Sequence, residues 1–106
     1  MTLNDLQALP ILQSRGIAHA CKEDANTLLY VHACLERFMR GDYGEICEED
    51  TAANNADLEA GDGHVLARYK ASGKLTGDIY IEAHFYYEQL DNIDYSNICI
   101  MYPSER

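Results

Sequence analysis

The sequence predicts a small α+β domain: an antiparallel sheet of about four strands with two helices packed on one face. The expected order along the chain is strand, helix, helix, strand, strand, strand. Two observations lead to this prediction. Apolar residues recur at three- and four-residue spacing between residues 24 and 60, as on the buried side of a helix. The rest of the chain is rich in β-branched and aromatic residues, and strands do not alternate with helices as in parallel folds.

The first predicted strand covers residues 8–12. Pro10 lies within it, and because proline has no backbone N–H to donate, it is confined to the start or the edge of a sheet. The segment therefore predicts an edge strand. Residues 14–17 follow, and Gly16 among them predicts a turn that ends the strand.

The first predicted helix covers residues 25–40. Asp24 is a favourable N-cap residue, and Gly41 can take the left-handed conformation that ends many helices. The apolar stripe of this helix, which we expect to face the core, consists of Leu28, Val31, Leu35, Phe38 and Met39.

A turn at residues 41–44 precedes a second, weaker helix. Glu48, Glu49 and Asp50 would lie in its first turn, where carboxylates interact favourably with the positive end of the helix dipole. Several alanines and a leucine continue the helix, and the glycines of residues 61–63 end it.

Three further segments have the composition of strands: residues 64–69, 78–85 and 95–102. Residues 71–74 predict a hairpin loop between the first two of these strands. Residues 88–94 predict a longer turn between the last two.

Length and composition agree with one domain that spans residues 1–106. Of the 106 residues 47% are hydrophobic, which is enough apolar surface for a single core. The chain is too short for a deep cleft between domains, so any chemistry must be simple. With 18 acidic and 8 basic side chains, its formal charge near pH 7 is −10.

The sequence predicts neither export nor membrane insertion. The longest apolar runs, residues 8–12 and 98–102, are far shorter than the roughly 18 to 20 residues that span a bilayer. Near the N-terminus, Asp5 stands where a secretory signal carries positive charge. We therefore expect a cytoplasmic protein. Its cysteines are then reduced thiols in or near the core: Cys21, Cys34, Cys47 and Cys99.

The histidines and cysteines do not predict a metal or cofactor site. His19 and Cys21, and again His32 and Cys34, form His-x-Cys triplets. On a helix, residues two apart point about 200° away from each other, so such a pair does not readily hold one ion. Neither Cys-x-x-Cys nor His-x-x-x-His occurs, and zinc sites are typically built on such spacings.

No pattern predicts catalysis. A cysteine could pair with His64 or His84 across the sheet, but no local motif marks an activated thiol. Glu48 and Glu49 are adjacent on a predicted helix and therefore diverge, which argues against an acid–base pair. We expect a protein that is not an enzyme.

Two long segments carry only acidic charge. No Lys or Arg occurs between Arg40 and Arg68, or between Lys74 and Arg106. Such a surface repels phosphate, so we do not expect direct binding of nucleic acid. The natural complement is a basic surface of another protein. The alternative is that these acids only form a solvated face that keeps the protein in solution.

Eight tyrosines are a second candidate feature for binding. Tyr86 and Tyr87 stand beside Glu88 and Asp91, and Tyr43 lies in the acidic turn. Aromatic rings between carboxylates can bind arginine through cation–π and ion-pair contacts. The alternative is that most of these rings line the core or the edges of the sheet.

Residues 41–50 read Gly-Asp-Tyr-Gly-Glu-Ile-Cys-Glu-Glu-Asp, and residues 101–105 read Met-Tyr-Pro-Ser-Glu. Together with an Asn-Asn pair and a Gly-Asp pair between them, these segments resemble a family of small proteins encoded on plasmids, phages and integrated elements of gut Firmicutes. That family has Trp where this chain has Tyr43, and Tyr where it has Arg106. The resemblance implies a mobile-element setting and supplies no established enzyme activity.

Small acidic proteins of mobile elements resemble inhibitors that act as DNA mimics, occupying the DNA-binding surface of a host nuclease. We therefore predict a non-enzymatic, anti-CRISPR-like inhibitor that binds a basic surface of a CRISPR effector or a similar nuclease. The predicted partner-binding residues are Asp42, Tyr43, Glu45, Glu48, Glu49, Asp50, Asp57 and Glu59. The alternative is a plasmid or phage maintenance protein that forms a homodimer or binds an element-encoded partner through its sheet edge.

Overall fold

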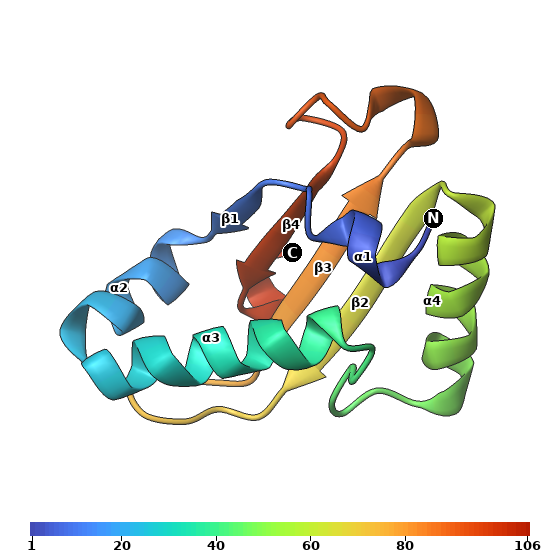
Figure 1. Cartoon of the computed structure of the whole chain (residues 1–106). Helices are drawn as coiled ribbons and strands as arrows, with labels where there is room; N and C mark the ends of the chain where they lie inside the picture. The colour runs from blue at the N-terminus through green and yellow to red at the C-terminus, as the bar shows by residue number, and fades with distance from the viewer.

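Four strands form one sheet in the order β1-β4-β3-β2, which crosses the middle of the molecule (Figure 1). The computed structural model describes residues 1–106. The strands are β1 Ile11–Gln13, β2 Gly63–Tyr69, β3 Ile79–Phe85 and β4 Asn97–Met101. The α-helices are α1 Leu3–Leu6, α2 Arg15–Glu23, α3 Ala25–Met39 and α4 Glu48–Ala60. Two short 3-10 helices follow β3 and β4: η1 Tyr87–Gln89 and η2 Pro103–Glu105.

The predicted class, α+β with a small sheet of four strands, is confirmed. Both predicted helices are present as α3 and α4, and the three late strands as β2, β3 and β4. The sheet is mixed, however, so the prediction of an antiparallel sheet is wrong for β1. This strand pairs with β4 in parallel, with Ile11 opposite Ile98. Three helices and two strands separate β1 from β4 along the chain, so no hairpin imposes an antiparallel pair.

Helix α2 begins where the sequence predicted a turn. Ser14 is its N-cap, and the Ser14 Oγ accepts a hydrogen bond from the Ile17 N–H at 3.3 Å. Gly16 has no positive φ and is required by packing instead, because a Cβ there would come within 2.9 Å of the Tyr102 ring. The serine and glycine therefore mark the start of a helix rather than the end of a strand.

Helix α3 begins at the predicted residue, ends one residue earlier than predicted and has nearly the predicted buried face. The Asp24 carboxylate caps it by accepting the Thr27 N–H at 3.2 Å, and Gly41 has a φ of 82° just beyond its end. Val31 and Phe38 are buried as expected. Leu28 is 38% exposed, so the buried side of α3 is centred slightly away from the predicted stripe.

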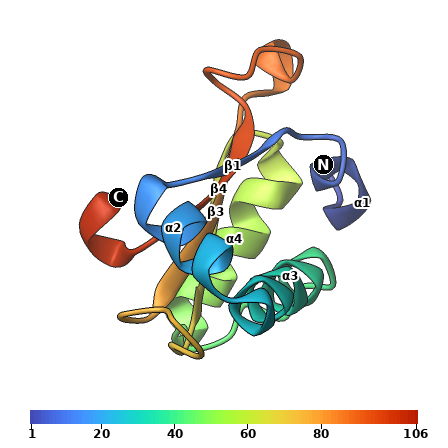
Figure 2. The same ribbon diagram turned by 90° about the vertical axis from the view of Figure 1, so that its left-hand side faces the viewer.

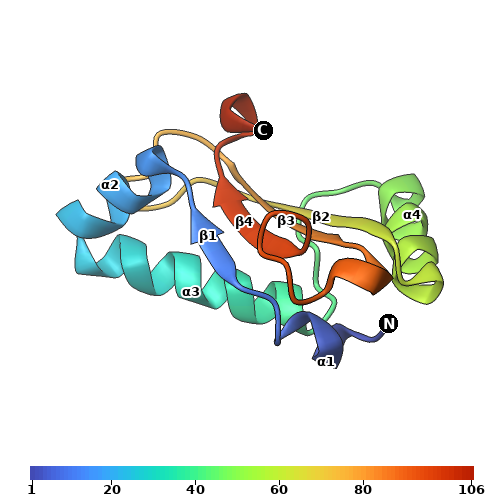
Figure 3. The ribbon, with the colours of Figure 1, turned by 90° about the horizontal axis from the view of Figure 1, so that it is seen from above.

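The helices surround the sheet rather than covering one face alone. Figures 2 and 3 show α1 and α3 on one face, α4 along the outer edge of β2, and η2 on the opposite face. The core lies between α3 and the sheet face turned toward it, where Phe38, Ile81 and Phe85 are fully buried. No helix in the structure combines the length and the apolar character that crossing a bilayer requires.

Candidate functional site

Side chains of α4 take the place of a fifth strand at the outer edge of β2. The Asn54 Nδ2 donates to the Leu66 carbonyl at 2.8 Å, and the Asn54 Oδ1 accepts the Leu66 N–H at 2.9 Å. The Asp57 Oδ2 accepts the His64 N–H at 3.1 Å. These contacts satisfy backbone groups that an edge strand otherwise leaves free. They hold α4 beside the sheet with its other side in solvent.

The loop between α3 and α4 closes the remaining part of this edge. The Arg68 N–H donates to the Tyr43 carbonyl at 3.1 Å, and the Glu45 N–H donates to the Arg68 carbonyl at 2.7 Å. Tyr43 is only 6% exposed, and its ring meets Phe38 edge-on at a centroid distance of 6.0 Å. Tyr43, predicted as a partner-binding residue, is therefore part of the core and offers almost no surface to a partner.

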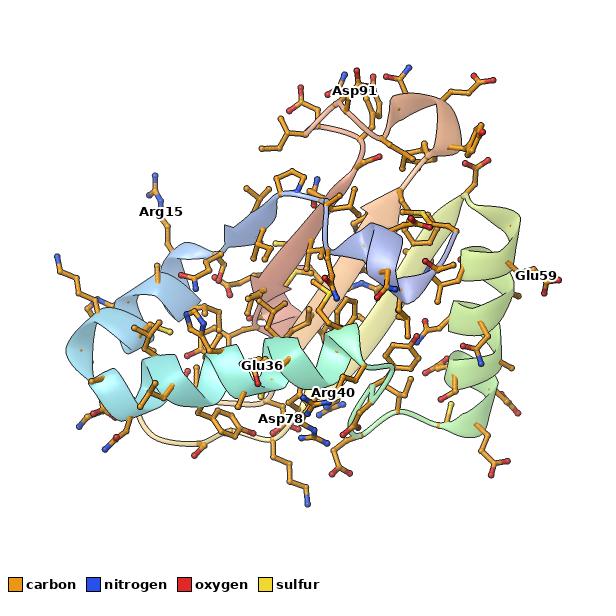
Figure 4. All side chains as sticks on the ribbon, viewed as in Figure 1. Arg15, Glu36, Arg40, Glu59, Asp78 and Asp91 are labelled. Atoms are coloured by element: carbon orange, nitrogen blue, oxygen red, sulfur yellow. The ribbon has the colours of Figure 1, made fainter.

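Four of the predicted acids lie exposed on α4. Glu48, Glu49 and Asp50 lie in its first turn and Glu59 in its last, and all four are exposed. None of them forms an ion pair or a side-chain hydrogen bond, and α4 contains no Lys or Arg. Figure 4 shows Glu59 pointing away from the sheet. We call these four residues the acidic face.

The remaining predicted acids have structural partners. Glu45 lies 4.0 Å from the Lys70 Nζ, a weak and exposed ion pair. The Asp57 carboxylate accepts the His64 N–H at the edge of β2. Asp42 accepts hydrogen bonds from the Arg37 Nε at 2.7 Å and from its Nη2 at 3.1 Å. Among the predicted acids, therefore, those of the acidic face are the ones without a bonded partner in the structure.

The Arg37–Asp42 ion pair makes stability depend on pH. The Arg37 guanidinium and the Gly44 N–H lower the pKa of Asp42 below its ordinary value of 3.8. Stability from this pair is therefore present above about pH 4 and is lost as the pH falls through the lowered pKa of the folded state. We expect Asp42→Asn to lower the urea midpoint at pH 6 and to lower it much less at pH 2.5.

The control for this prediction is Asp91→Asn, which removes an exposed carboxylate that has no bonded partner. Urea denaturation of both variants at the two pH values measures the effect. An equal response of the two variants would contradict the role assigned to Arg37.

The His-x-Cys triplets do not converge in the structure. His19 is exposed and pairs with Glu23 at 3.1 Å, whereas Cys21 is buried, and His32 and Cys34 diverge in the same way on α3. No group of three or more potential ligand side chains is placed to hold a metal ion. All four cysteines are free. The prediction that they lie in or near the core is wrong for the exposed Cys47.

A cluster of titratable groups lies on the sheet face opposite α3. Glu82 is 1% exposed, and its carboxylate accepts from the Arg106 Nη2 at 2.8 Å and lies 3.1 Å from the His84 Nε2. Cys99 is opposite Glu82 in the neighbouring strand. Burial, with the nearby Glu82 carboxylate, raises the pKa of the Cys99 thiol. A raised pKa disfavours the thiolate, so the arrangement does not support nucleophilic catalysis.

Exposed tyrosines form a second surface feature that the predicted site residues did not include. Tyr86, Tyr87 and Tyr95 lie on the loop between β3 and β4 and line a hollow together with Asp62 and Glu88. The Tyr-Tyr-Glu sequence at residues 86–88 was the available signal. The sequence could not show that this loop lies beside Asp62, in the turn that follows α4.

Comparisons of the chain with protein-family models, with curated proteins and with solved structures give no match. The class that the structure defines is an α+β domain with a mixed four-stranded sheet and an acidic helix at one edge. Its resemblance to a family of mobile-element proteins stays a prediction.

Proposed function

We propose that the protein is a non-enzymatic inhibitor, carried by a mobile genetic element, that acts in the cytoplasm. It binds a basic nucleic-acid-binding surface of a host nuclease, such as a CRISPR effector. The observation that carries the proposal is the acidic face. Its four carboxylates are exposed and form no ion pair, and the buried Asn54 fastens their helix to the sheet.

The negative charge of the acidic face makes a basic protein surface its expected partner. Exposed carboxylates on one helix attract the Lys and Arg side chains that line a nucleic-acid groove. The formal charge of −10 adds a long-range attraction that speeds the approach of a basic partner at low salt. An inhibitor of this kind needs no catalytic group, only a rigid surface of the right charge.

The first test is survival of a targeted plasmid in bacteria that carry a CRISPR effector. Expression of the chain should raise the number of transformants that keep the plasmid. If several effector types show no increase, the proposed inhibition is wrong for them.

Charge reversal on the acidic face should reduce both binding of the nuclease and protection of the plasmid. We expect Glu49→Lys combined with Glu59→Lys to weaken binding by about tenfold or more and to reduce its dependence on salt. The matched control is Glu23→Lys combined with Glu36→Lys, which changes the net charge equally at exposed positions on α2 and α3. Equal loss in both double variants would show that only net charge matters and would contradict a defined binding face.

A second candidate function, self-association in the maintenance of the element, is favoured by β1. Residues 10, 12 and 14 direct their backbone groups toward β4. The backbone groups of Ile11 and Gln13 therefore point to the free side of the strand. Ile11 is 46% and Leu12 39% exposed. An uncovered edge with apolar side chains can pair with a second copy.

Light scattering over a range of protein and salt concentrations separates the two candidates. A dimer that persists in high salt indicates apolar pairing through β1 and favours self-association. A monomer at all concentrations favours the inhibitor, which binds its partner through charge.

A further inference from the structure

A hollow of about 530 Å³ adjoins the C-terminal end of α4. It lies between the loop that follows β3 and the turn that joins α4 to β2, where the chain projects beyond the sheet (Figure 1). Its lining consists of Asp62, Tyr86, Tyr87, Glu88, Gln89 and Tyr95. The hollow therefore combines three aromatic rings with two carboxylates and contains no basic residue.

The fold does not account for the exposure of these rings. Tyr87 is 74% exposed, Tyr95 52% and Tyr86 47%. Elsewhere tyrosines have structural partners: the Tyr30 hydroxyl donates to the Lys70 carbonyl, and the Tyr69 hydroxyl donates to the Asp42 carbonyl. The three rings of the hollow have no such bond. Large apolar surface left in water at one place typically marks a binding site.

The loop that carries the rings is held in place by hydrogen bonds from its backbone N–H groups to side-chain oxygens. The Tyr86 N–H donates to the buried Ser96 Oγ at 3.2 Å, and the Tyr87 N–H donates to the Asp62 Oδ1 at 2.6 Å. Tyr86 and Tyr95 meet edge-on, with centroids 6.3 Å apart and an interplanar angle of 85°. These contacts order the backbone that carries the three rings and orient the Tyr86 and Tyr95 rings against each other before any ligand arrives, which lowers the entropic cost of binding.

The chemistry of the lining selects a cation. The electron-rich faces of tyrosine attract positive charge, and the carboxylates of Asp62 and Glu88 supply acceptors at the rim of the hollow. No Lys or Arg lies between residues 74 and 106 to neutralise them. A guanidinium fits better than an ammonium, because it is planar, stacks on aromatic rings and is less strongly hydrated.

We propose that this hollow binds the guanidinium group of an arginine side chain exposed on a partner protein. The proposal deepens the proposed function, on which it rests for the identity of the partner, because it adds an arginine anchor beside the acidic face. Asp62 connects the two surfaces, since it lies two residues beyond the end of α4 and also accepts the Tyr87 N–H.

The test is NMR titration of the full chain with an acetylated, amidated Gly-Arg-Arg-Gly peptide. We expect saturable shifts of the backbone amides of Tyr86, Tyr87 and Tyr95. The same peptide with citrulline in place of arginine keeps the shape of the side chain and removes its charge, and it should bind about tenfold more weakly. Tyr87→Ala should weaken binding of the arginine peptide about threefold to fivefold.

Leu29→Ala is the matched control, because Leu29 is 66% exposed on α3, away from the hollow, and should leave peptide binding unchanged. Equal binding of the citrulline peptide, equal loss in the Leu29 variant, or absence of saturable shifts would each overturn the arginine site. The titration does not depend on a nuclease. Peptide binding without plasmid protection would support the hollow and contradict the inhibitor, and protection without peptide binding would do the reverse.

Discussion

Gly44→Ala is expected to destabilise the protein by about 3 to 4 kcal/mol. Gly44 has a φ of 69°, a conformation that costs an L residue energy by itself. A Cβ at this position would lie 2.1 Å from the Arg68 carbonyl oxygen and 2.8 Å from the Tyr69 ring. Because the nearer atom belongs to the backbone of β2, no side-chain rotation can relieve the contact.

To relieve this contact, the loop at Gly44 would have to move away from β2. Gly44 forms an isolated parallel bridge with Arg68, flanked by the hydrogen bonds of Tyr43 and Glu45 to the same residue. Moving it exposes Tyr43, which fills space beside Phe38 in the core. Loss of these contacts adds to the backbone strain.

Urea denaturation followed by circular dichroism measures this effect, and Gly77→Ala is the matched control. Gly77 has no positive φ, and a Cβ there would meet nothing within 4 Å. We expect the control to change the free energy of unfolding by less than about 0.5 kcal/mol. Similar midpoints for the two variants would show that the loop does not need the close approach at Gly44.

The parts of the fold that the sequence predicted well are specified locally. Helix α3 has its capping residue Asp24, its terminating Gly41 and an apolar stripe within one segment, so its boundaries follow from neighbouring residues. The parallel pairing of β1 depends on contacts between distant segments and has no local signal. Ser14 illustrates the ambiguity, because a serine with a glycine two residues later can begin either a turn or a helix.

In the candidate site, too, the sequence predicted what depends on local composition and missed what depends on contacts between distant segments. Composition was sufficient to locate an acidic region, but not to separate structural acids from free ones. Asp42 and Asp57 accept hydrogen bonds that the fold needs, whereas Glu49 and Glu59 face solvent. The distinction depends on which side of α4 meets β2, and the helix has too few large apolar residues to indicate this side. The polar residue Asn54 forms the contact instead.

Asn54→Ala is expected to destabilise the protein by about 2 to 3 kcal/mol. Asn54 is 3% exposed, and both of its hydrogen bonds go to the backbone of Leu66. Alanine would leave the Leu66 N–H and carbonyl without partners beneath α4, where water has poor access. An unsatisfied buried backbone group costs more than the hydrogen bond itself contributes.

The matched control is Asn55→Ala, because Asn55 is the next residue of α4 and is exposed without a bonded partner. It should change the urea midpoint little, and equal effects of the two variants would contradict the edge-closing role of Asn54. Asn54 is buried and cannot touch a partner. A loss of plasmid protection in the Asn54 variant must therefore come from displacement of α4, whereas a loss in the Glu49 and Glu59 variant at unchanged stability must come from the contact itself.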